Sequence, residues 1–221
     1  MSYFGFGDSV VQPNKHLTQP TTYNVLTSSE ELAISLTITK QHLGLNLDST
    51  DQDDYLTLLI RSAMSFFENY TGRILINTEF QTYFTYINQV YELKRSKLQS
   101  LSFFQYADED SVWVDFDTSY YYLTYEQDYS RIILDLNQTF PTKLDRFQTV
   151  SVGFVAGYGD TDSSIPAIVK LGLLQHVGNL YSNRGDCSSG CADSNVPANA
   201  MNIYKQYKIF DLYGGSYRGG L

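Results

Sequence analysis

The 221-residue sequence has few residues of the kinds that bind metals, and its charge is unbalanced toward acid. It contains one tryptophan, two cysteines and three histidines, and it has 15 basic and 24 acidic residues. The net charge is -9, so we do not expect the protein to bind nucleic acid through its phosphates, because that contact needs clustered lysine and arginine. Such a chain could still line a passage through which DNA slides without sticking.

Long hydrophobic runs are also missing. No stretch approaches the roughly 18 apolar residues of a membrane helix, so no membrane association is expected. Residues 1–15 contain neither a basic leader nor an apolar segment, so no secretory signal is expected. Apolar residues nevertheless make up 43% of the chain, which is enough for the core of one substantial domain.

Catalytic and metal-binding patterns are absent from the sequence. His16, His42 and His176 are widely separated and have no catalytic spacing. Cys187 and Cys191 lie in a Gly/Ser-rich loop with no nearby ligand to complete a zinc site, so free thiols are expected, with a local disulfide as the alternative. The acidic clusters indicate helix capping and turns, since none has the ligand series of a calcium loop. They are Asp51/Asp53/Asp54, Asp108/Glu109/Asp110, Asp115/Asp117 and Asp160/Asp162. No catalytic, cofactor-binding or metal-binding residue is predicted, and an enzyme is not expected.

One amphipathic helix is predicted over residues 51–71. Its apolar residues recur at steps of three and four, so they share one face. They are Leu56, Leu59, Ile60, Ala63, Phe66, Phe67 and Tyr70. Thr50 is the expected cap, with Asp53 completing a capping box, and Gly72 is placed to end the helix.

Two further helices are predicted on either side. The first covers residues 37–43, capped by Thr37 and ended by Gly44. The second covers residues 166–183, with Pro166 in its first turn. Glycine inside a helix lowers stability, so Gly172 and Gly178 suggest the close approach of another helix or strand.

Between these helices the periodicity changes to two, and tyrosine and phenylalanine are abundant, with 19 and 13 copies. Alternation begins at Ile74–Ile87, and more strand-like runs follow. These are Val90–Leu93, Leu98–Tyr106, Val112–Phe116, Tyr120–Tyr125, Arg131–Leu134 and Thr149–Ala156. Residues 75–156 are therefore predicted to form a small antiparallel β region.

The predicted fold class is α+β. The long helix and the second helix pack together as a helical core, into which the β region is inserted, and the whole domain spans residues 32–184. Residues 1–31 are expected to be a flexible N-terminal arm, because their apolar residues are scattered singly among Gly, Pro, Ser and Thr. Residues 185–221 are expected to be a loop and a C-terminal arm with a short helical stretch at Asn199–Tyr207.

A series of short motifs occurs in the order found in head–tail connector (adaptor, or head-completion) proteins of tailed bacteriophages. The motifs are L-x-x-x-K-x-H-L from Leu36 to Leu43, E-x-x-T-G-R from Glu68 to Arg73, T-x-F from Thr78 to Phe80, L-x-S-L from Leu98 to Leu101, a tyrosine with an acidic turn from Tyr106 to Asp110, A-G-Y-G from Ala156 to Gly159, Ile165-Pro166, and L-Y-x-x-R from Leu180 to Arg184. Together they cover residues 36–184. The chain departs from the pattern at Arg95-Ser96-Lys97, where a proline is usual.

This resemblance implies a structural virion protein of the neck, made in the bacterial host cytoplasm. Its relatives form a ring of about a dozen copies beneath the portal protein. The ring extends the DNA channel and provides the platform for a stopper or tail-completion protein. The implied partners are therefore the portal, the next neck protein, other copies of the chain, and genomic DNA that passes without sequence-specific binding.

The resemblance also assigns candidate residues. A portal-binding C-terminal arm would use Met201, Ile203, Tyr204, Tyr207, Ile209, Phe210 and Tyr213. The residues that carry the family motifs and their core are Leu56, Leu59, Ala63, Phe67, Gly72, Arg73, Pro166, Tyr181 and Arg184.

Two other functions stay open. The chain could be another virion component whose β-rich module binds a host surface or a glycan, and Tyr120-Tyr121-Tyr122 would then form part of the platform. On a strand, however, alternate rings would point into the core and out to an interface. The second alternative is a small hydrolase whose carboxylates converge only in the fold.

Overall fold

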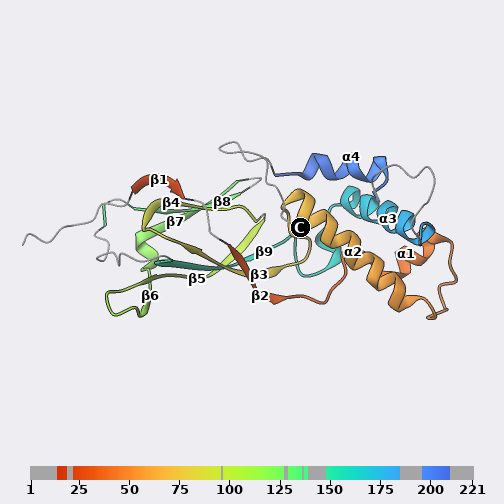
Figure 1. The fold of residues 1–221 in the computed structure, drawn as a ribbon, viewed down its shortest axis with the longest axis horizontal. Coiled ribbons are helices and arrows are strands. Elements are labelled where there is room, and N and C mark those ends of the chain that lie inside the picture. The colour runs from red at the N-terminus through yellow and green to blue at the C-terminus, as the bar shows by residue number, and fades with distance from the viewer. Residues whose placement is uncertain are drawn as a thin grey trace, which may run out of the picture.

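The computed structural model describes residues 14–18, 22–95, 97–126, 129–135, 137–138, 148–184 and 196–209. Figure 1 shows an elongated arrangement, with a β sandwich at one end and the helices gathered at the other. The order of elements, helix then β region then helix, is the one predicted, and the fold is a mixed α+β fold. Within the described residues no helix is long and apolar enough to cross a membrane.

The helical end consists of α1 (Leu36–Leu43), α2 (Asp53–Thr71), α3 (Ala167–Ser182) and α4 (Ala198–Tyr207). These helices enclose a core of fully or nearly fully buried side chains. The members from α2 include Leu59, Ile60, Ala63 and Phe67, those from α3 are Val169, Leu173 and Val177, and those from α4 are Ala200, Ile203 and Tyr204. Leu56 of α2 is also completely buried. The apolar face predicted for residues 51–71 is thus the face that packs.

The helix ends confirm the predicted glycines and correct the predicted caps. Gly44 and Gly72 both have the left-handed backbone that ends a helix, with φ of 68° and 77°. Ser35, and not Thr37, caps α1, because its hydroxyl accepts a hydrogen bond from the amide of Ile38.

The start of α2 also differs from the predicted capping box. Gln52 occupies the cap position of α2 without a side-chain hydrogen bond, and Thr50 lies outside the helix. The reason is that Asp53 has another partner: its carboxylate lies 2.5 Å from the ammonium of the buried Lys40. Lys40 also donates to the carbonyl oxygen of Ser49 at 2.7 Å, so it ties α1 to the start of α2.

The β end is a sandwich of two sheets. One sheet has the order β1-β4-β8-β7, and the other has the order β2-β3-β9-β5-β6. The strands are β1 (Asn14–Thr18), β2 (Tyr23–Ser28), β3 (Thr78–Phe84), β4 (Asn88–Leu93), β5 (Leu98–Ala107), β6 (Trp113–Asp115), β7 (Tyr121–Tyr125), β8 (Ser130–Leu134) and β9 (Val150–Ala156). Short 3-10 helices, η1 (Thr118–Tyr120) and η2 (Asp162–Ser164), precede β7 and α3.

Aromatic and aliphatic side chains fill the space between the two sheets. Phe80 and Phe84 of β3 face this core while Glu79, Gln81 and Tyr83 alternate with them, as the period of two predicted. The ring of Phe84 lies 4.8 Å from that of Tyr91 on β4, in an edge-to-face contact that joins the sheets.

The predicted N-terminal arm is in part a component of this sandwich. β1 pairs in parallel with β4, and β2 pairs antiparallel with β3. The β region is therefore larger than residues 75–156, and it is not purely antiparallel. Five of the six residues of β2 are exposed, so the sequence of β2 has no apolar pattern that predicts a strand. Its hydrogen bonds to β3 define it as a strand instead.

Candidate interaction surfaces

The helix α4 is fixed to α3 through a glycine and a tyrosine. A β-carbon added to Gly172 would lie 3.0 Å from Cε1 of Tyr204. The Tyr204 hydroxyl lies 3.3 Å from both the Gly172 carbonyl oxygen and Nδ1 of His176. The close approach that the glycine suggested is thus confirmed, and its partner is α4. Gly178 is less crowded, since its β-carbon would lie at an ordinary contact distance of 3.4 Å from Nε2 of His42 on α1.

His176 and Tyr204 form a buried polar pair surrounded by rings. The ring of Phe66 meets His176 edge to face at 5.3 Å, and the ring of Phe67 meets Tyr204 in the same way at 5.1 Å. Burial lowers the pKa of His176 to about 4 and raises that of Tyr204. Both groups are therefore neutral at pH 7, which suits a packing role.

This packing corrects the expectation of a free arm over Asn199–Tyr207. Ile203 and Tyr204 are buried in the helical core, and Met201 and Tyr207 are partly buried against it. A partner could contact the two buried side chains only if α4 left α3. Phe210 and Tyr213, the remaining candidates for portal contact beyond Ile209, lie outside the described residues.

The E-x-x-T-G-R motif forms the turn where α2 ends. The Thr71 hydroxyl donates to the carbonyl oxygen of Phe67 at 2.8 Å, and the Glu68 carboxylate accepts a hydrogen bond of 2.8 Å from the amide of Leu75. Burial raises the pKa of Glu68, while the Leu75 amide and the charge of Arg95 act in the opposite direction. The motif therefore sets the direction in which the chain leaves α2 toward β3.

The same turn also holds the end of α4. The Thr71 carbonyl oxygen accepts from the amide of Ile209 at 2.8 Å, and Arg73 donates to the Tyr207 carbonyl oxygen. The Ile209 side chain lies over Gly72, 3.5 Å from where a β-carbon would be. Arg73 is buried, and Gly72 has the positive φ that favours glycine, so this motif determines where the chain after α4 departs.

The A-G-Y-G motif forms the second connection between the two ends of the molecule. The Tyr158 amide donates to the Leu75 carbonyl oxygen, and the Asn77 amide donates to the Gly159 carbonyl oxygen. A β-carbon on Gly157 would lie 2.7 Å from backbone atoms of Asn77, and its φ of 154° is one that other residues rarely adopt. Only glycine lets these two crossing segments come so close.

The L-Y-x-x-R motif packs against the opposite end of α2. The Tyr181 hydroxyl donates to Oε1 of Gln52 at 2.6 Å. The Arg184 guanidinium lies over two rings, 4.5 Å from that of Tyr181 and 5.0 Å from that of Tyr55. Pro166 stands at the other end of α3, as its N-cap. Gln52 and Tyr55 were not expected from the sequence, because their partners are distant in the chain: Gln52 lies 129 positions before Tyr181.

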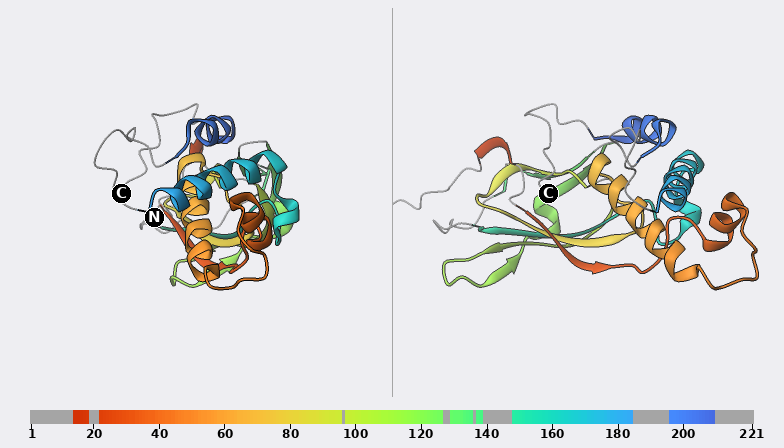
Figure 2. Two further views of the ribbon diagram at one scale, coloured as in Figure 1. Left: turned by 90° about the vertical axis from the view of Figure 1, so that its right-hand side faces the viewer. Right: turned by 45° about the vertical axis from the view of Figure 1, so that its right-hand side comes forward.

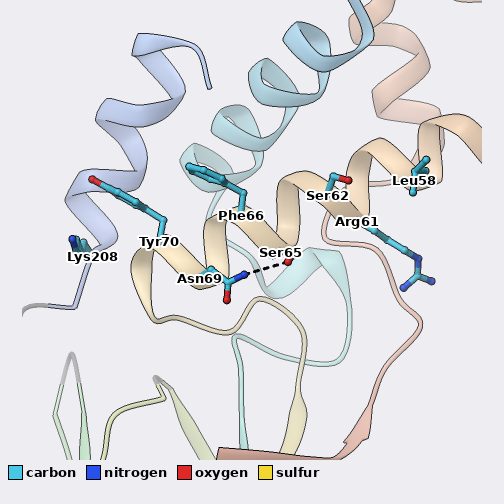
Figure 3. Close-up of a pocket in the computed structure, with 8 residues that line it drawn as sticks. All are labelled: Leu58, Arg61, Ser62, Ser65, Phe66, Asn69, Tyr70 and Lys208. Carbon is cyan, nitrogen blue, oxygen red and sulfur yellow. Dashed lines mark hydrogen bonds between the residues drawn. The ribbon is translucent and has the colours of Figure 1, made fainter. Parts of the chain in front are cut away.

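An open groove of about 760 Å³ runs along the outer side of α2. Figure 3 shows its lining residues, which lie along α2 except for Lys208 after α4: Leu58, Arg61, Ser62, Ser65, Phe66, Asn69, Tyr70 and Lys208. Phe66 and Tyr70 stack at 6.0 Å, and the Lys208 ammonium lies 5.0 Å from the Tyr70 ring. Leu58 is 60% exposed. A leucine on the polar side of an amphipathic helix was the signal in the sequence for this surface, and sequence reasoning missed it.

The tyrosine run is divided between core and surface. Tyr121 packs edge to face on Phe104 at 5.1 Å, whereas Tyr122 is 55% exposed on β7. This is the alternation that strand periodicity predicted. The three tyrosines therefore do not form one flat platform.

The described residues contain no cluster of metal-binding side chains. Across the described ranges, no group of three or more His, Cys, Asp or Glu side chains is placed to hold a metal ion. Cys187 and Cys191 lie outside the described residues.

Residues 33–121 match the family model of the phage gp6-like head-tail connector proteins. The resemblance to the connector family is confirmed. The matched segment runs from the start of the helical core to the start of β7, and it includes the E-x-x-T-G-R turn. No curated protein sequence matches the chain.

Solved structures share the fold of this chain over most of its length. The chain resembles a chain in the neck of an empty GTA particle computed with C6 symmetry, with a TM-score of 0.72 and 20% identity. It also resembles a chain in the virion of a native gene transfer agent (GTA) particle and one in the neck of a native GTA particle computed with C12 symmetry, each with a TM-score of 0.70 and 18% identity. In all three, the match covers 88% of this chain and 99% of the other.

Proposed function

We propose that this chain is a head–tail adaptor, a structural virion protein that forms a ring of about a dozen copies beneath the portal. Two independent similarities support the proposal. The connector family model matches residues 33–121, and a chain from a particle neck has the same fold over 88% of this chain. In this role the protein acts by assembly and catalyses no reaction.

In the ring, the adaptor extends the channel through which DNA leaves the capsid, and it presents a platform to a stopper or tail-completion protein. The net charge of -9 supports the first task, because an acidic wall repels the phosphate backbone and lets DNA slide. The adaptor would then be located in the neck of the virion, after synthesis in the host cytoplasm.

The segment that follows α4 is the proposed portal-binding arm. Arg73 and Thr71 fix the point from which it departs, at Ile209. The assignment shifts portal contact from Ile203 and Tyr204, which are buried against α3, to the residues beyond Tyr207. Phe210 and Tyr213 are the aromatic residues of this arm closest to the departure point.

Truncation tests the proposed arm against the portal protein of the same phage. A chain that ends at Ile209 should fold as stably as the full chain and should no longer co-purify with the portal. A second truncation, which ends at Ala198, serves as a contrast: it removes Ile203 and Tyr204, so the helical core should lose stability. Normal portal binding by the chain ending at Ile209 would disprove the arm assignment.

A further inference from the structure

Two apolar surfaces of the helical end lie on different helices. The first is the groove along α2, in which Leu58 is 60% exposed. The second is a ridge on α3 made of Ile168 and Leu171, each 43% exposed and one turn apart. A single exposed leucine is ordinary, but the groove and the α3 ridge give one molecule two different surfaces that each expose apolar side chains.

The two surfaces point in different directions. α2 and α3 pack against each other, and their buried residues belong to one core, which includes Ile60 and Phe67 of α2 and Val169 and Leu173 of α3. Leu58 lies on the opposite side of α2 from its buried residues. On α3, Leu171 lies opposite Val169 and Leu173, and Ile168 lies on the flank beside it. Figure 3 shows the groove facing the viewer with α3 behind α2, and Figure 2 shows the two helices crossing as separate layers.

The two surfaces also differ in the charges that lie beside them. The groove is lined by two cations, Arg61 and Lys208, and no acidic side chain is among its lining residues in the described part of the chain. Arg61 pairs with Glu30, which is itself highly exposed. The start of α3 is acidic instead, since Asp160 and Asp162 precede it, with Asp162 3.4 Å from Lys170.

We propose that these two surfaces form the contact between neighbouring copies of this chain, with the Ile168/Leu171 ridge of one copy seated in the α2 groove of the next. A head-to-tail contact needs two different surfaces on each copy, and repeated rotation then closes a ring. A contact between two identical surfaces would stop at a dimer. The inference rests on the proposed ring, for which it names the interface.

Cysteine cross-linking tests the contact directly. In full-length chains with Cys187→Ser and Cys191→Ser, the double variant Leu58→Cys/Leu171→Cys is oxidised alone and with the portal protein. A disulfide needs α-carbons within about 7 Å, so only a direct contact links these positions. The expected product is a ladder of covalent oligomers up to the full ring, while an equal mixture of the two single variants gives covalent dimers and nothing larger.

Charge substitutions provide a second readout that does not depend on disulfide geometry. Leu58→Glu and Leu171→Glu should each weaken self-association by about tenfold or more, because a carboxylate would replace a buried apolar contact. Leu47→Glu is the matched control, since Leu47 is 47% exposed and lies on neither surface, and it should assemble normally.

The outcomes separate the interface from the ring. If native particle mass shows a ring but the double variant yields no ladder, the interface is wrong and the proposed function stands. Dimers from Leu58→Cys alone, or cross-links from Leu58→Cys to the portal protein in place of a second copy, would overturn the interface as well. If no assembly forms with or without the portal, both the interface and the proposed function fail.

Discussion

Gly172 on α3 and Tyr204 on α4 lie so close that a β-carbon on the glycine would stand 3.0 Å from Cε1 of the tyrosine. The tyrosine hydroxyl lies 3.3 Å from the carbonyl oxygen of the same glycine. This contact makes α4 part of the folded core. It thereby fixes the beginning of the segment that we assign to portal binding.

Gly172→Val should separate α4 from α3, because the added methyl groups have no space beside Tyr204. Overpacking of this kind costs about 1–3 kcal/mol, and valine also has a modest helix propensity. Chemical denaturation measures the loss of unfolding free energy. Gly178→Ala is the control: its β-carbon would lie at ordinary contact distances from His42 (3.4 Å) and Leu43 (3.8 Å), so stability should be unchanged or higher. Equal effects of the two substitutions would contradict a special contact at Gly172.

His176 should make the stability of the protein depend on pH between 4 and 6.5. Burial holds its pKa near 4 in the folded protein, below the usual 6.5, so the unfolded chain binds a proton more readily across this interval. The contribution of neutral His176 is therefore complete above pH 6.5 and is lost as the pH falls toward 4. The change is on the order of 2 kcal/mol.

The measurement for His176 is the unfolding free energy against pH in the wild type and in His176→Gln, which cannot titrate. Its profile should be flatter between pH 4 and 6.5 than that of the wild type. The raised pKa of Glu68 acts in the opposite direction, but it is present in both proteins. A wild-type slope in His176→Gln would show that His176 is not the responsible group.

Phe67→Ala should cost about 3–5 kcal/mol of stability. Phe67 is completely buried in the helical core and contacts the Tyr204 ring edge to face. Leu58→Ala on the same helix should cost less than about 0.5 kcal/mol, since Leu58 is exposed in the single chain. Thermal or chemical unfolding compares the two, and a loss below about 1 kcal/mol for Phe67→Ala would mean that this face does not carry the core.

Arg73→Ala should loosen the end of α4 without unfolding the β sandwich. Arg73 is buried and donates to the carbonyl oxygen of Tyr207, next to the Ile209 amide that donates to Thr71. Hydrogen exchange at Ile209 and in the last turn of α4 should become faster, while β9 keeps its protection. Arg61→Ala removes an exposed arginine paired with Glu30 and should change neither. Unchanged hydrogen exchange at Ile209 in Arg73→Ala would show that Arg73 does not hold the end of α4.

The sequence predicted those parts of the fold that local patterns determine. Residues 51–71 have helical periodicity and a terminal glycine, so α2 was predicted within two residues at its start and correctly at its end. The alternation around Phe80 and Phe84 likewise predicted β3. Both patterns are the direct result of one buried face.

Features that depend on distant partners could not be predicted. β2 has little apolar pattern of its own and exists because β3 pairs with it, so it was assigned to an arm. Asp53 was taken as a capping residue, but the buried ammonium of Lys40 binds it. α4 was predicted as a helix, yet nothing local indicated that Tyr204 would pack on Gly172. Each error comes from a contact between segments far apart in the sequence.

The most direct test of the adaptor role is the particle mass in solution, first of the chain alone and then with the portal protein of the same phage, followed by imaging. The expected particle is a ring of about a dozen copies of this 25.2-kDa chain, alone or on the portal. A monomer that does not bind the portal would contradict the adaptor role.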